Sequence, residues 1–325
     1  MRTVSFFLVS IALLISACAP RASAPTPTLG DSASQNDSTS HTDYTQDVES
    51  ASPSDPQADS ASPGLAPAGA PNAYWVTNPA SGSRLHMTAT YPPGWNGELV
   101  PALILVPGGT GVSEPQKAKR LAAEGFLAII FDPEGRGQSE GTEDYNGFVG
   151  QDGLAAVIEA ATALPGLDAD RYGLVSFSYG VTMATGALAR HPDLPIDFYI
   201  DWEGPVDRNY TSGCRPAPQQ HIQWESCEND SWWAEREALT FITDVQVPYQ
   251  RVQSQKDHVQ RENTHAIDIV NAAVAGGVPW VRLNEYPAGQ SYDAANPPAM
   301  LADSLDKQLE RTVAAYAWYI IENIL

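Results

Sequence analysis

The sequence predicts an α/β fold, in which a doubly wound and mostly parallel sheet is covered by helices on both faces. Two observations lead to this prediction. Continuous apolar runs such as 102–106 and 126–131, which are typical of strands buried on both faces, alternate with helix-forming segments. Several runs also end in turns rich in glycine and serine, and such turns carry functional residues where parallel strands end.

The elements follow one another in a regular order along the chain. We expect strands at 74–76, 85–91, 102–106, 126–131, 174–175, 196–203, within 247–259, and at 280–284. Helices are expected at 116–124, at about 153–164 and at 183–190. The sixth strand is followed by a small insertion, at about 204–243, which carries several tryptophans and two cysteines.

Ser178 occupies a corner between a strand and a helix. The apolar pair Leu174-Val175 leads into Ser176-Phe177-Ser178-Tyr179-Gly180, and the helix-forming run 183–190 follows. This order of elements lifts a serine hydroxyl out of a sheet edge. Ser176 stands where such corners usually have glycine, and serine is small enough to be tolerated there. An ordinary buried strand, with Ser178 only capping the next helix, is the competing interpretation.

A second turn follows the strand at 102–106 and reads Pro107-Gly108-Gly109-Thr110-Gly111. A glycine-rich turn at the carboxyl end of a central strand lets backbone N–H groups face a cavity, which is half of an oxyanion hole. A phosphate-binding loop is the alternative, but the Gly-Lys-Ser/Thr ending of such loops is missing.

The N-terminal part predicts export and lipid anchoring. A short positive start and an apolar run at 4–15 lead to Ile15-Ser16-Ala17-Cys18, which looks like a bacterial lipobox. We expect a signal peptide at 1–18, a lipidated Cys18 that anchors the protein to a membrane of the cell envelope, and a disordered tether at 19–72, rich in Ser, Ala, Pro and Asp. A plain signal peptide with an incidental cysteine is the alternative. The catalytic domain would occupy 73–325.

The net charge limits the kinds of partner that the protein can bind, and the cysteine content indicates a disulfide. The chain has 39 acidic and 18 basic side chains and a formal net charge of −21, which argues against nucleic acid as a partner. Cys214 and Cys227 lie close together in an exported region, so we expect a disulfide between them. No metal site is expected there, because the pair lacks the closely spaced Cys and His ligands of such sites.

Together the turns resemble those of the α/β-hydrolase superfamily, over nearly all of 74–325. The matching pieces, in the family's order, are Pro107-Gly108-Gly109, Asp132-x-x-Gly135-x-Gly137-x-Ser139 and the corner at Ser178. The resemblance implies that Ser178 is the nucleophile, that Gly109 and Tyr179 offer backbone N–H groups to an oxyanion, and that Asp257 is the triad acid. It implies no metal or organic cofactor.

The chain departs from this family where the catalytic histidine belongs. By spacing, Gln290 occupies that position after the last strand, and no histidine follows His265. An amide side chain cannot accept the proton of a serine. A histidine from elsewhere could act as the base, with His258 better placed than His265.

Two other readings of that departure remain open. In one, a carboxylate at the end of the sixth strand, such as Glu203 or Asp201, is the base. In the other, the domain has lost hydrolysis and only binds.

The resulting functional prediction is a lipid-anchored, extracytoplasmic serine hydrolase that cleaves ester or related acyl bonds of a small molecule through a Ser178 acyl-enzyme. The alternative is a catalytically silent envelope protein that binds a ligand or partner in the same pocket. The aromatic side chains of the insertion, including Trp232 and Trp233, are expected to pack onto the sheet in preference to binding substrate.

Overall fold

A computed structural model describes residues 72–211, 214, 225–260, 262–302 and 308–325. The expected signal peptide at 1–18, the lipidation site Cys18 and all but the last residue of the expected tether lie outside these residues. Among the described helices, none combines the length and the apolar character needed to span a membrane.

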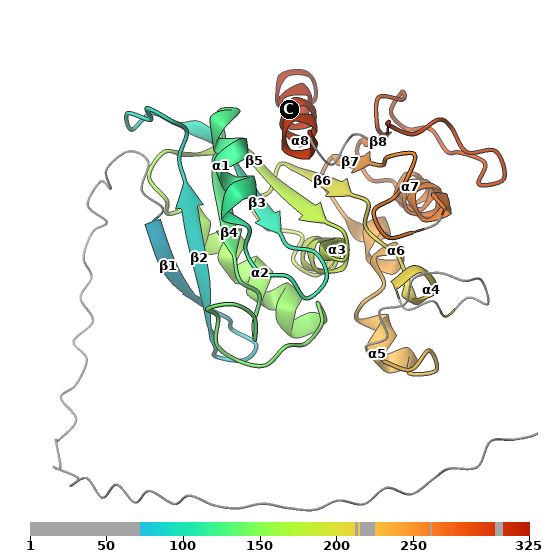
Figure 1. The fold of residues 1–325 in the computed structure, drawn as a ribbon, viewed down its shortest axis with the longest axis horizontal. Coiled ribbons are helices and arrows are strands. Elements are labelled where there is room, and N and C mark those ends of the chain that lie inside the picture. The colour runs from blue at the N-terminus through green and yellow to red at the C-terminus, as the bar shows by residue number, and fades with distance from the viewer. Residues whose placement is uncertain (1–71, 212–213, 215–224, 261, 303–307) are drawn as a thin grey trace, which may run out of the picture. The chain divides into compact units, whose positions relative to one another are not determined.

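An eight-stranded sheet forms the centre of the domain (Figure 1). Its strands lie in the order β1-β2-β4-β3-β5-β6-β7-β8; β1 and β2 pair antiparallel to their neighbours, and all other pairs are parallel. The strands are β1 (Asn72–Thr77), β2 (Arg84–Thr90), β3 (Val100–Val106), β4 (Leu127–Phe131), β5 (Leu167–Phe177), β6 (Phe198–Trp202), β7 (Tyr249–Val252) and β8 (Val281–Leu283). The predicted fold class is confirmed.

Helices cover both faces of the sheet, and α1 lies in front of it in the view of Figure 1. The main helices are α1 (Pro115–Ala123), α2 (Phe148–Ala161), α3 (Gly180–Arg190), α7 (Thr264–Gly276) and α8 (Leu309–Asn323). Successive residues of β3 point to opposite faces: Ile104 belongs to the hydrophobic cluster that includes residues of α2, α3 and α7, whereas Leu105 belongs to the cluster that includes residues of α1 and α8. The strand is buried on both sides, which is why its sequence is continuously apolar.

Helix α2 begins five residues before its expected start near Gly153. Asp144 explains the difference, because its carboxylate accepts hydrogen bonds from Gly147 N at 3.1 Å and Gly150 N at 3.0 Å. A carboxylate at this end satisfies free helix N–H groups and complements the helix dipole. Asp144 lies before the apolar residues from which the helix was predicted. Those residues alone therefore place the start of the helix too late.

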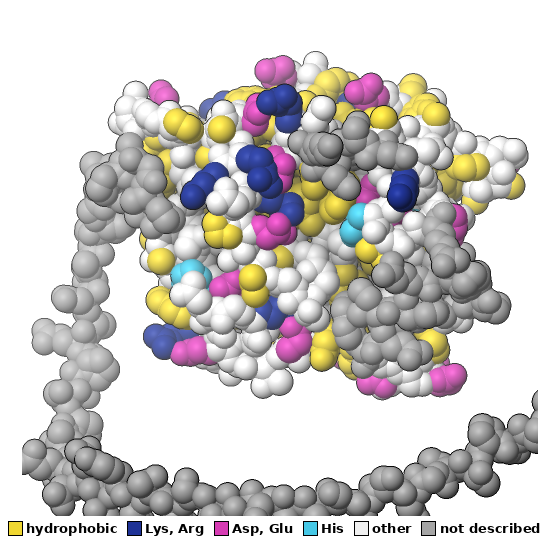
Figure 2. Space-filling model, viewed as in Figure 1, with side chains coloured by type: hydrophobic (Ala, Val, Ile, Leu, Met, Phe, Trp, Pro, Cys, Tyr) yellow, Lys and Arg dark blue, Asp and Glu magenta, His cyan; other side chains and the backbone are white. Residues whose placement is uncertain are grey.

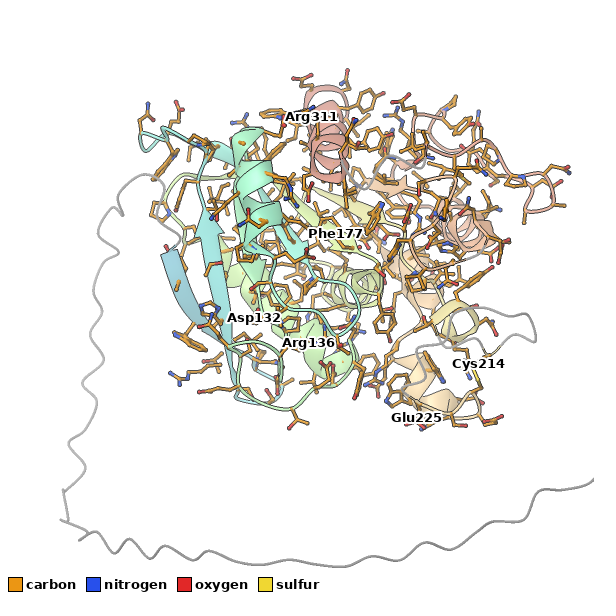
Figure 3. The ribbon with its side chains drawn as sticks, in the orientation of Figure 1. Asp132, Arg136, Phe177, Cys214, Glu225 and Arg311 are labelled. Atoms are coloured by element: carbon orange, nitrogen blue, oxygen red, sulfur yellow. A yellow bond between two sulfur atoms is a disulfide. The ribbon has the colours of Figure 1, made fainter. Side chains whose placement is uncertain are left out.

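The insertion after β6 contains the short helices α4 (Arg208–Thr211), α5 (Asp230–Ala234) and α6 (Ala238–Phe241) and the 3₁₀ turn η1 (Ile242–Asp244). Cys214 and Cys227 form the expected disulfide, with Cα atoms 5.7 Å apart. Figure 3 shows Cys214 and Glu225 together on this side of the molecule. Trp233 is fully buried, while Trp232 is half-buried.

Charged side chains are buried beneath the carboxyl ends of the central strands. Arg251 of β7 and Asp201 of β6 form an ion pair in which neither side chain is exposed. Tyr249 donates a hydrogen bond to Asp201 at 3.1 Å, and Arg251 donates one to Gln253 at 2.7 Å. These hydrogen bonds offset part of the cost of burying the two charges, while Nε of Arg251 has no hydrogen-bond partner among the described residues. The ion pair joins two neighbouring strands directly below the loops described next.

Candidate active site

Ser178 lies in the predicted corner, between β5 and α3. Its φ of 51° is in the left-handed region, where a non-glycine residue is strained, as expected of a serine lifted out of the sheet edge. Its backbone N–H donates to Trp202 O at 2.9 Å, which ties the corner to the end of β6. Gly180 follows because a Cβ there would lie 2.7 Å from Pro107 O. The Ser178 side chain is only partly buried, so a substrate can reach it.

The glycine-rich turn after β3 packs against this corner. A Cβ on Gly108 would lie 2.8 Å from the Cβ of Ser178 and 2.7 Å from Phe177 O, so only glycine permits the approach. Gly109, with a φ of 56°, is next to this contact, and Tyr179 follows Ser178 directly. Both residues are therefore adjacent to the serine. Their role as oxyanion donors stays a prediction.

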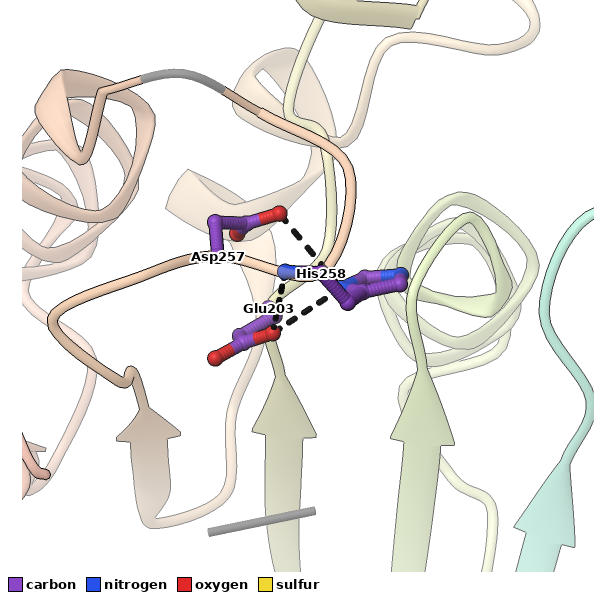
Figure 4. A group of neighbouring side chains, drawn as sticks. All are labelled: Glu203, Asp257 and His258. Carbon is purple, nitrogen blue, oxygen red and sulfur yellow. Dashed lines mark hydrogen bonds and ion pairs between the residues drawn. The ribbon is translucent and has the colours of Figure 1, made fainter. Parts of the chain in front are cut away.

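His258 is the imidazole that reaches the serine. Its Nε2 lies 2.9 Å from Ser178 Oγ, and its Nδ1 lies 2.9 Å from Glu203 Oε2. Figure 4 shows Glu203 and Asp257 on the Nδ1 side of the ring. With Nδ1–H donating to the carboxylate, Nε2 is left as a proton acceptor facing the hydroxyl. Serine, histidine and carboxylate are thus connected in one line.

Trp202 stacks on the same imidazole. The two ring centroids are 4.5 Å apart and the ring planes differ by 25°. Stacking fixes the plane of the imidazole, and the electron-rich indole face also favours a positive charge on it. Trp202 therefore packs on one face of the His258 ring, while Glu203 contacts Nδ1 at the edge of that ring.

Glu203 is fixed by hydrogen bonds on both of its oxygens. Oε1 accepts from the backbone N–H and the hydroxyl of Ser254, and Oε2 accepts from the backbone N–H of His258 at 3.1 Å as well as from its ring. The side chain is buried, and its φ of 49° is left-handed. Leaving a buried acceptor without a donor is costly, so these hydrogen bonds hold the side chain in one position. The carboxylate of Glu203 is therefore held in a fixed position.

Asp257 also lies near the imidazole, with Oδ1 3.4 Å from Nδ1 of His258. That oxygen already accepts hydrogen bonds from Val259 N at 2.8 Å and Gln260 N at 2.7 Å. Its Oδ2 accepts from Gln253 Nε2 at 3.0 Å and lies 3.2 Å from Nε2 of His265. Asp257 therefore shapes the turn that carries His258 and adds negative charge beside it, whereas Glu203 is the closer partner of the ring.

The other candidates from the sequence lie away from the serine hydroxyl. Gln290 is exposed in the loop after β8. Asp201 is buried and paired with Arg251. His265 is also buried, with Nδ1 3.1 Å from Arg251 Nη2 and 3.0 Å from Gly204 O. None of these placements suits a general base that acts on Ser178.

Glu203, Asp257 and His258 also have the composition of a metal site, because one ligand atom of each lies within 4.8 Å of the others. However, each of the four carboxylate oxygens already accepts a hydrogen bond or ion pair, as given above. A metal would have to displace several of these bonds. The arrangement is therefore better suited to orienting the imidazole.

The sequence indicates Glu203 only as a possible base. The contact of Glu203 with His258 could have been expected from the position of Glu203 at the carboxyl end of β6. This strand lies next to β5, which precedes Ser178. Side chains at the ends of adjacent parallel strands meet at one sheet edge. The stacking of Trp202 on His258 had no signal in the sequence.

The pKa of Asp257 leads to a prediction on acid stability. Burial alone would raise the pKa of this carboxyl, but the hydrogen bond and charge of His265, together with Gln253 and the Gln260 amide, hold the pKa below its usual range. A depressed pKa stabilises the folded state above the unfolded-state value, about 3.9, and this contribution is lost as the pH falls. We expect Asp257→Asn to lower the free energy of unfolding by roughly 1–3 kcal/mol at neutral pH.

The measurement is urea unfolding of wild type and Asp257→Asn between pH 2 and pH 8, a range that spans the usual aspartate pKa. The difference between the two proteins should be constant above about pH 5 and should shrink as the pH falls below 4. A difference that stays the same down to pH 2 would contradict the prediction.

No protein-family model matches the sequence, and neither does any curated protein. Solved structures match it in fold. Dipeptidyl peptidase 4 of Porphyromonas gingivalis superposes with a TM-score of 0.58 at 16% identity over 78% of this chain and 36% of that one. Acylaminoacyl peptidase of Pyrococcus horikoshii gives 0.54 at 14% identity, over 78% of this chain and 41% of that one. The chain therefore spans less than half the length of these two peptidases.

Est1E of Butyrivibrio proteoclasticus, solved with ferulic acid bound, is matched over its whole length and over 77% of this chain, with a TM-score of 0.56 and 16% identity. At such low identities the likeness concerns the fold alone. Together with the sheet order and the strand–turn–helix corner at Ser178, these matches show that the chain has the α/β-hydrolase fold.

Proposed function

We propose that this protein is a serine hydrolase that cleaves ester or related acyl bonds through an acyl-enzyme on Ser178. The observation that carries the proposal is the 2.9 Å contact between Nε2 of His258 and Oγ of Ser178. A hydroxyl is a weak nucleophile until a base within hydrogen-bond reach accepts its proton. The rival, a silent binding protein, does not need an imidazole at this distance with its other nitrogen on a buried carboxylate.

The first half-reaction forms the acyl-enzyme. Nε2 of His258 takes the proton of Ser178 as Oγ attacks the carbonyl carbon, and the carbonyl oxygen becomes an oxyanion that the N–H groups of Gly109 and Tyr179 stabilise. When the tetrahedral intermediate collapses, the bond to the leaving alcohol breaks. His258 returns its proton to that alcohol, and the acyl group stays on Oγ.

The second half-reaction repeats these steps with water. His258 removes a proton from the water, the hydroxide oxygen attacks the acyl carbon, and the C–Oγ bond breaks as Oγ regains its proton. The acid product leaves and the free enzyme is restored. No external oxidant or metal enters the balance of either half-reaction.

Glu203 takes the orienting role in this mechanism, in place of the predicted Asp257. It is 2.9 Å from Nδ1 of His258, against 3.4 Å for Asp257, and each of its oxygens is fixed by the turn that begins at Ser254. The carboxylate keeps the proton on Nδ1 and stabilises the imidazolium that forms during attack. Trp202 stabilises the same charge from the ring face.

The matched structures favour an ester among the possible acyl substrates. The two peptidases are much longer than this chain, so their activity as whole proteins carries little weight here. Est1E is matched over its whole length and was solved with ferulic acid, an aromatic carboxylic acid. We therefore propose esters of small carboxylic acids as the substrate class, with peptides as the less favoured alternative.

Covalent labelling tests the nucleophile. A fluorophosphonate probe should label the wild type on Ser178, and hydrolysis of a chromogenic short-chain ester should fall roughly a millionfold, or to the detection limit, in Ser178→Ala. Ser139→Ala is the matched control, because this serine lies in another loop and its hydroxyl donates to Asp132 O. If folded wild type takes up no more probe than Ser178→Ala, the proposal fails.

A pair of carboxamide variants distinguishes the two carboxylates. Glu203→Gln should lower kcat roughly a thousandfold or more, because the imidazole loses the partner that sets its tautomer. Asp257→Asn should leave kcat within about tenfold, since its main contacts are to backbone amides and buried side chains. Steady-state kinetics of both variants, after circular dichroism has shown them folded, decides between the assignments. The reverse order of effects would return the orienting role to Asp257.

We also propose, from the sequence, that the protein is exported and anchored through a lipid on Cys18. A cysteine at the end of a short apolar run, preceded by small residues, fits the bacterial lipobox. In a bacterial host, radiolabelled palmitate should be incorporated into the wild type, which should fractionate with membranes. Cys18→Ser should lose both label and membrane association, while Cys214→Ser should keep them. Palmitate labelling of Cys18→Ser would refute the proposal.

A further inference from the structure

The loop that follows β4, residues 132–147, lies beside both turns that are predicted to bind an oxyanion. Strand β3 pairs with β4 on one side and with β5 on the other, and all three run parallel. Their carboxyl ends therefore meet at one edge of the sheet. Figure 3 shows Asp132 and Arg136, which belong to this loop. The mechanism proposed above assigns no role to its side chains.

Arg136 connects this loop to the glycine-rich turn after β3. Basic side chains gather at the surface over α1 in Figure 2, whereas Arg136 is buried, with a relative exposure of 5%. Its guanidinium pairs with Glu143, and Nη2 also donates to Asn146 Oδ1 at 2.7 Å. Nη1 donates to Gly111 O at 3.4 Å, and Gly111 N closes the turn by donating to Gly108 O at 2.8 Å. Arg136 thus holds the end of the turn that contains the predicted oxyanion donor.

Asn146 connects the same loop to the residue after the serine. Its side chain is fully buried, and Nδ2 donates to Tyr179 O at 2.9 Å. A guanidinium can only donate hydrogen bonds, so the amide atom that faces Arg136 must be the oxygen. Nδ2 is then the atom left for Tyr179 O. Arg136 therefore fixes the direction in which the Asn146 amide points.

Tyr179 is held at a second point by the neighbouring residue of the loop. Its hydroxyl donates to Tyr145 O at 3.2 Å, and burial raises the pKa of Tyr179 well above its usual value, so the hydroxyl stays protonated. Tyr145 and Asn146 both have left-handed backbone, with φ of 56° and 66°. Such strain persists only where the surrounding structure imposes it, and it is common at functional sites. The two residues that hold Tyr179 are therefore strained themselves.

We infer that Arg136 and Asn146 are positioning residues that set the two oxyanion donors, the N–H groups of Gly109 and Tyr179, in register with each other. The inference rests on the proposed function, in which these groups stabilise the oxyanion. The two donors follow different strands, and an oxyanion hole is effective only when its donors are fixed before the reaction begins. Neither positioning residue needs to touch the substrate.

Steady-state kinetics of the full chain with a chromogenic short-chain ester tests the inference. Asn146→Gly removes the amide and leaves a residue that adopts left-handed backbone freely. Loss of one oxyanion donor costs roughly 10²–10³ in kcat, so a displaced donor should lower kcat at least about tenfold. KM should stay within about threefold, because the buried amide does not touch the substrate.

Two further readouts separate positioning from a general loosening of the fold. Ser178 Oγ adds to the carbonyl carbon of a butyl trifluoromethyl ketone, His258 takes the hydroxyl proton, and the carbonyl oxygen becomes an oxyanion in the hole. The inhibition constant of this ketone should rise by about the factor by which kcat/KM falls. The pH profile of kcat/KM should not move, since the side-chain hydrogen bonds of Asn146 go to Arg136 and Tyr179.

Arg136→Lys is the second variant, and it remains informative if Asn146→Gly does not fold. Lysine keeps the positive charge beside Glu143. An ammonium lacks the planar fork with which the guanidinium reaches three partners at once. We therefore expect kcat to fall at least about tenfold here as well, with the same increase in the inhibition constant of the ketone.

Each variant has a matched control. Asn271→Gly on α7 also removes an amide that donates to a backbone carbonyl, in this case Tyr292 O at 2.8 Å. Arg120→Lys on α1 also changes an arginine that pairs with a glutamate, Glu310. Both controls should keep kcat and the inhibition constant within about threefold of the wild type.

Failure of this inference and failure of the proposed function give different results. A wild type that hydrolyses no ester and takes up no fluorophosphonate would end both. If the wild type is active and the folded variants Asn146→Gly and Arg136→Lys keep kcat within about threefold, the inference alone is wrong. It is also wrong if kcat falls while the ketone binds as tightly as before, or if the pH profile shifts together with kcat.

Discussion

The proposed chemistry depends on one imidazole that is held on three sides. Glu203 accepts from Nδ1 of His258, Trp202 stacks on the ring face, and Ser178 lies at Nε2. A histidine that is restrained in this way loses little orientational freedom when the reaction begins, and so its proton transfer costs less reorganisation. A neutral amide at the family's usual histidine position, Gln290, is compatible with the same mechanism once the imidazole comes from the β7–α7 turn.

The carboxyl end of β6 organises most of these contacts. Trp202 O accepts from the strained Ser178 backbone, the Trp202 ring carries His258, and the next residue supplies the buried carboxylate. Left-handed backbone at Ser178 and Glu203 costs of order 1–3 kcal/mol each, and the packed sheet below is rigid enough to impose it. The carboxyl end of β6 therefore positions Ser178, the ring of His258 and Glu203, and a shift of this strand end would disturb all three.

Below this edge, the buried pair of Arg251 and Asp201 connects the sheet to the turn that carries the imidazole. Arg251 lies 3.1 Å from Nδ1 of His265, whose other nitrogen lies 3.2 Å from Asp257. Buried charges need partners in a low-dielectric interior, and these four side chains provide them for one another. The network thus gives the His258 turn a fixed electrostatic support as well as a packed one.

The sequence by itself determined the fold class, because strands buried on both faces must be continuously apolar. It also determined the corner at Ser178, because local backbone geometry specifies a sharp turn between a strand and a helix. It also predicted Gly109 as an oxyanion donor, and it indicated His258 as the histidine best placed to act as the base. Only the tertiary structure brought Glu203 to the imidazole. Asp257 was the nearer carboxylate along the chain, but neighbouring residues in a turn need not point the same way, whereas the ends of adjacent parallel strands converge in space. That convergence cannot be read from sequence spacing.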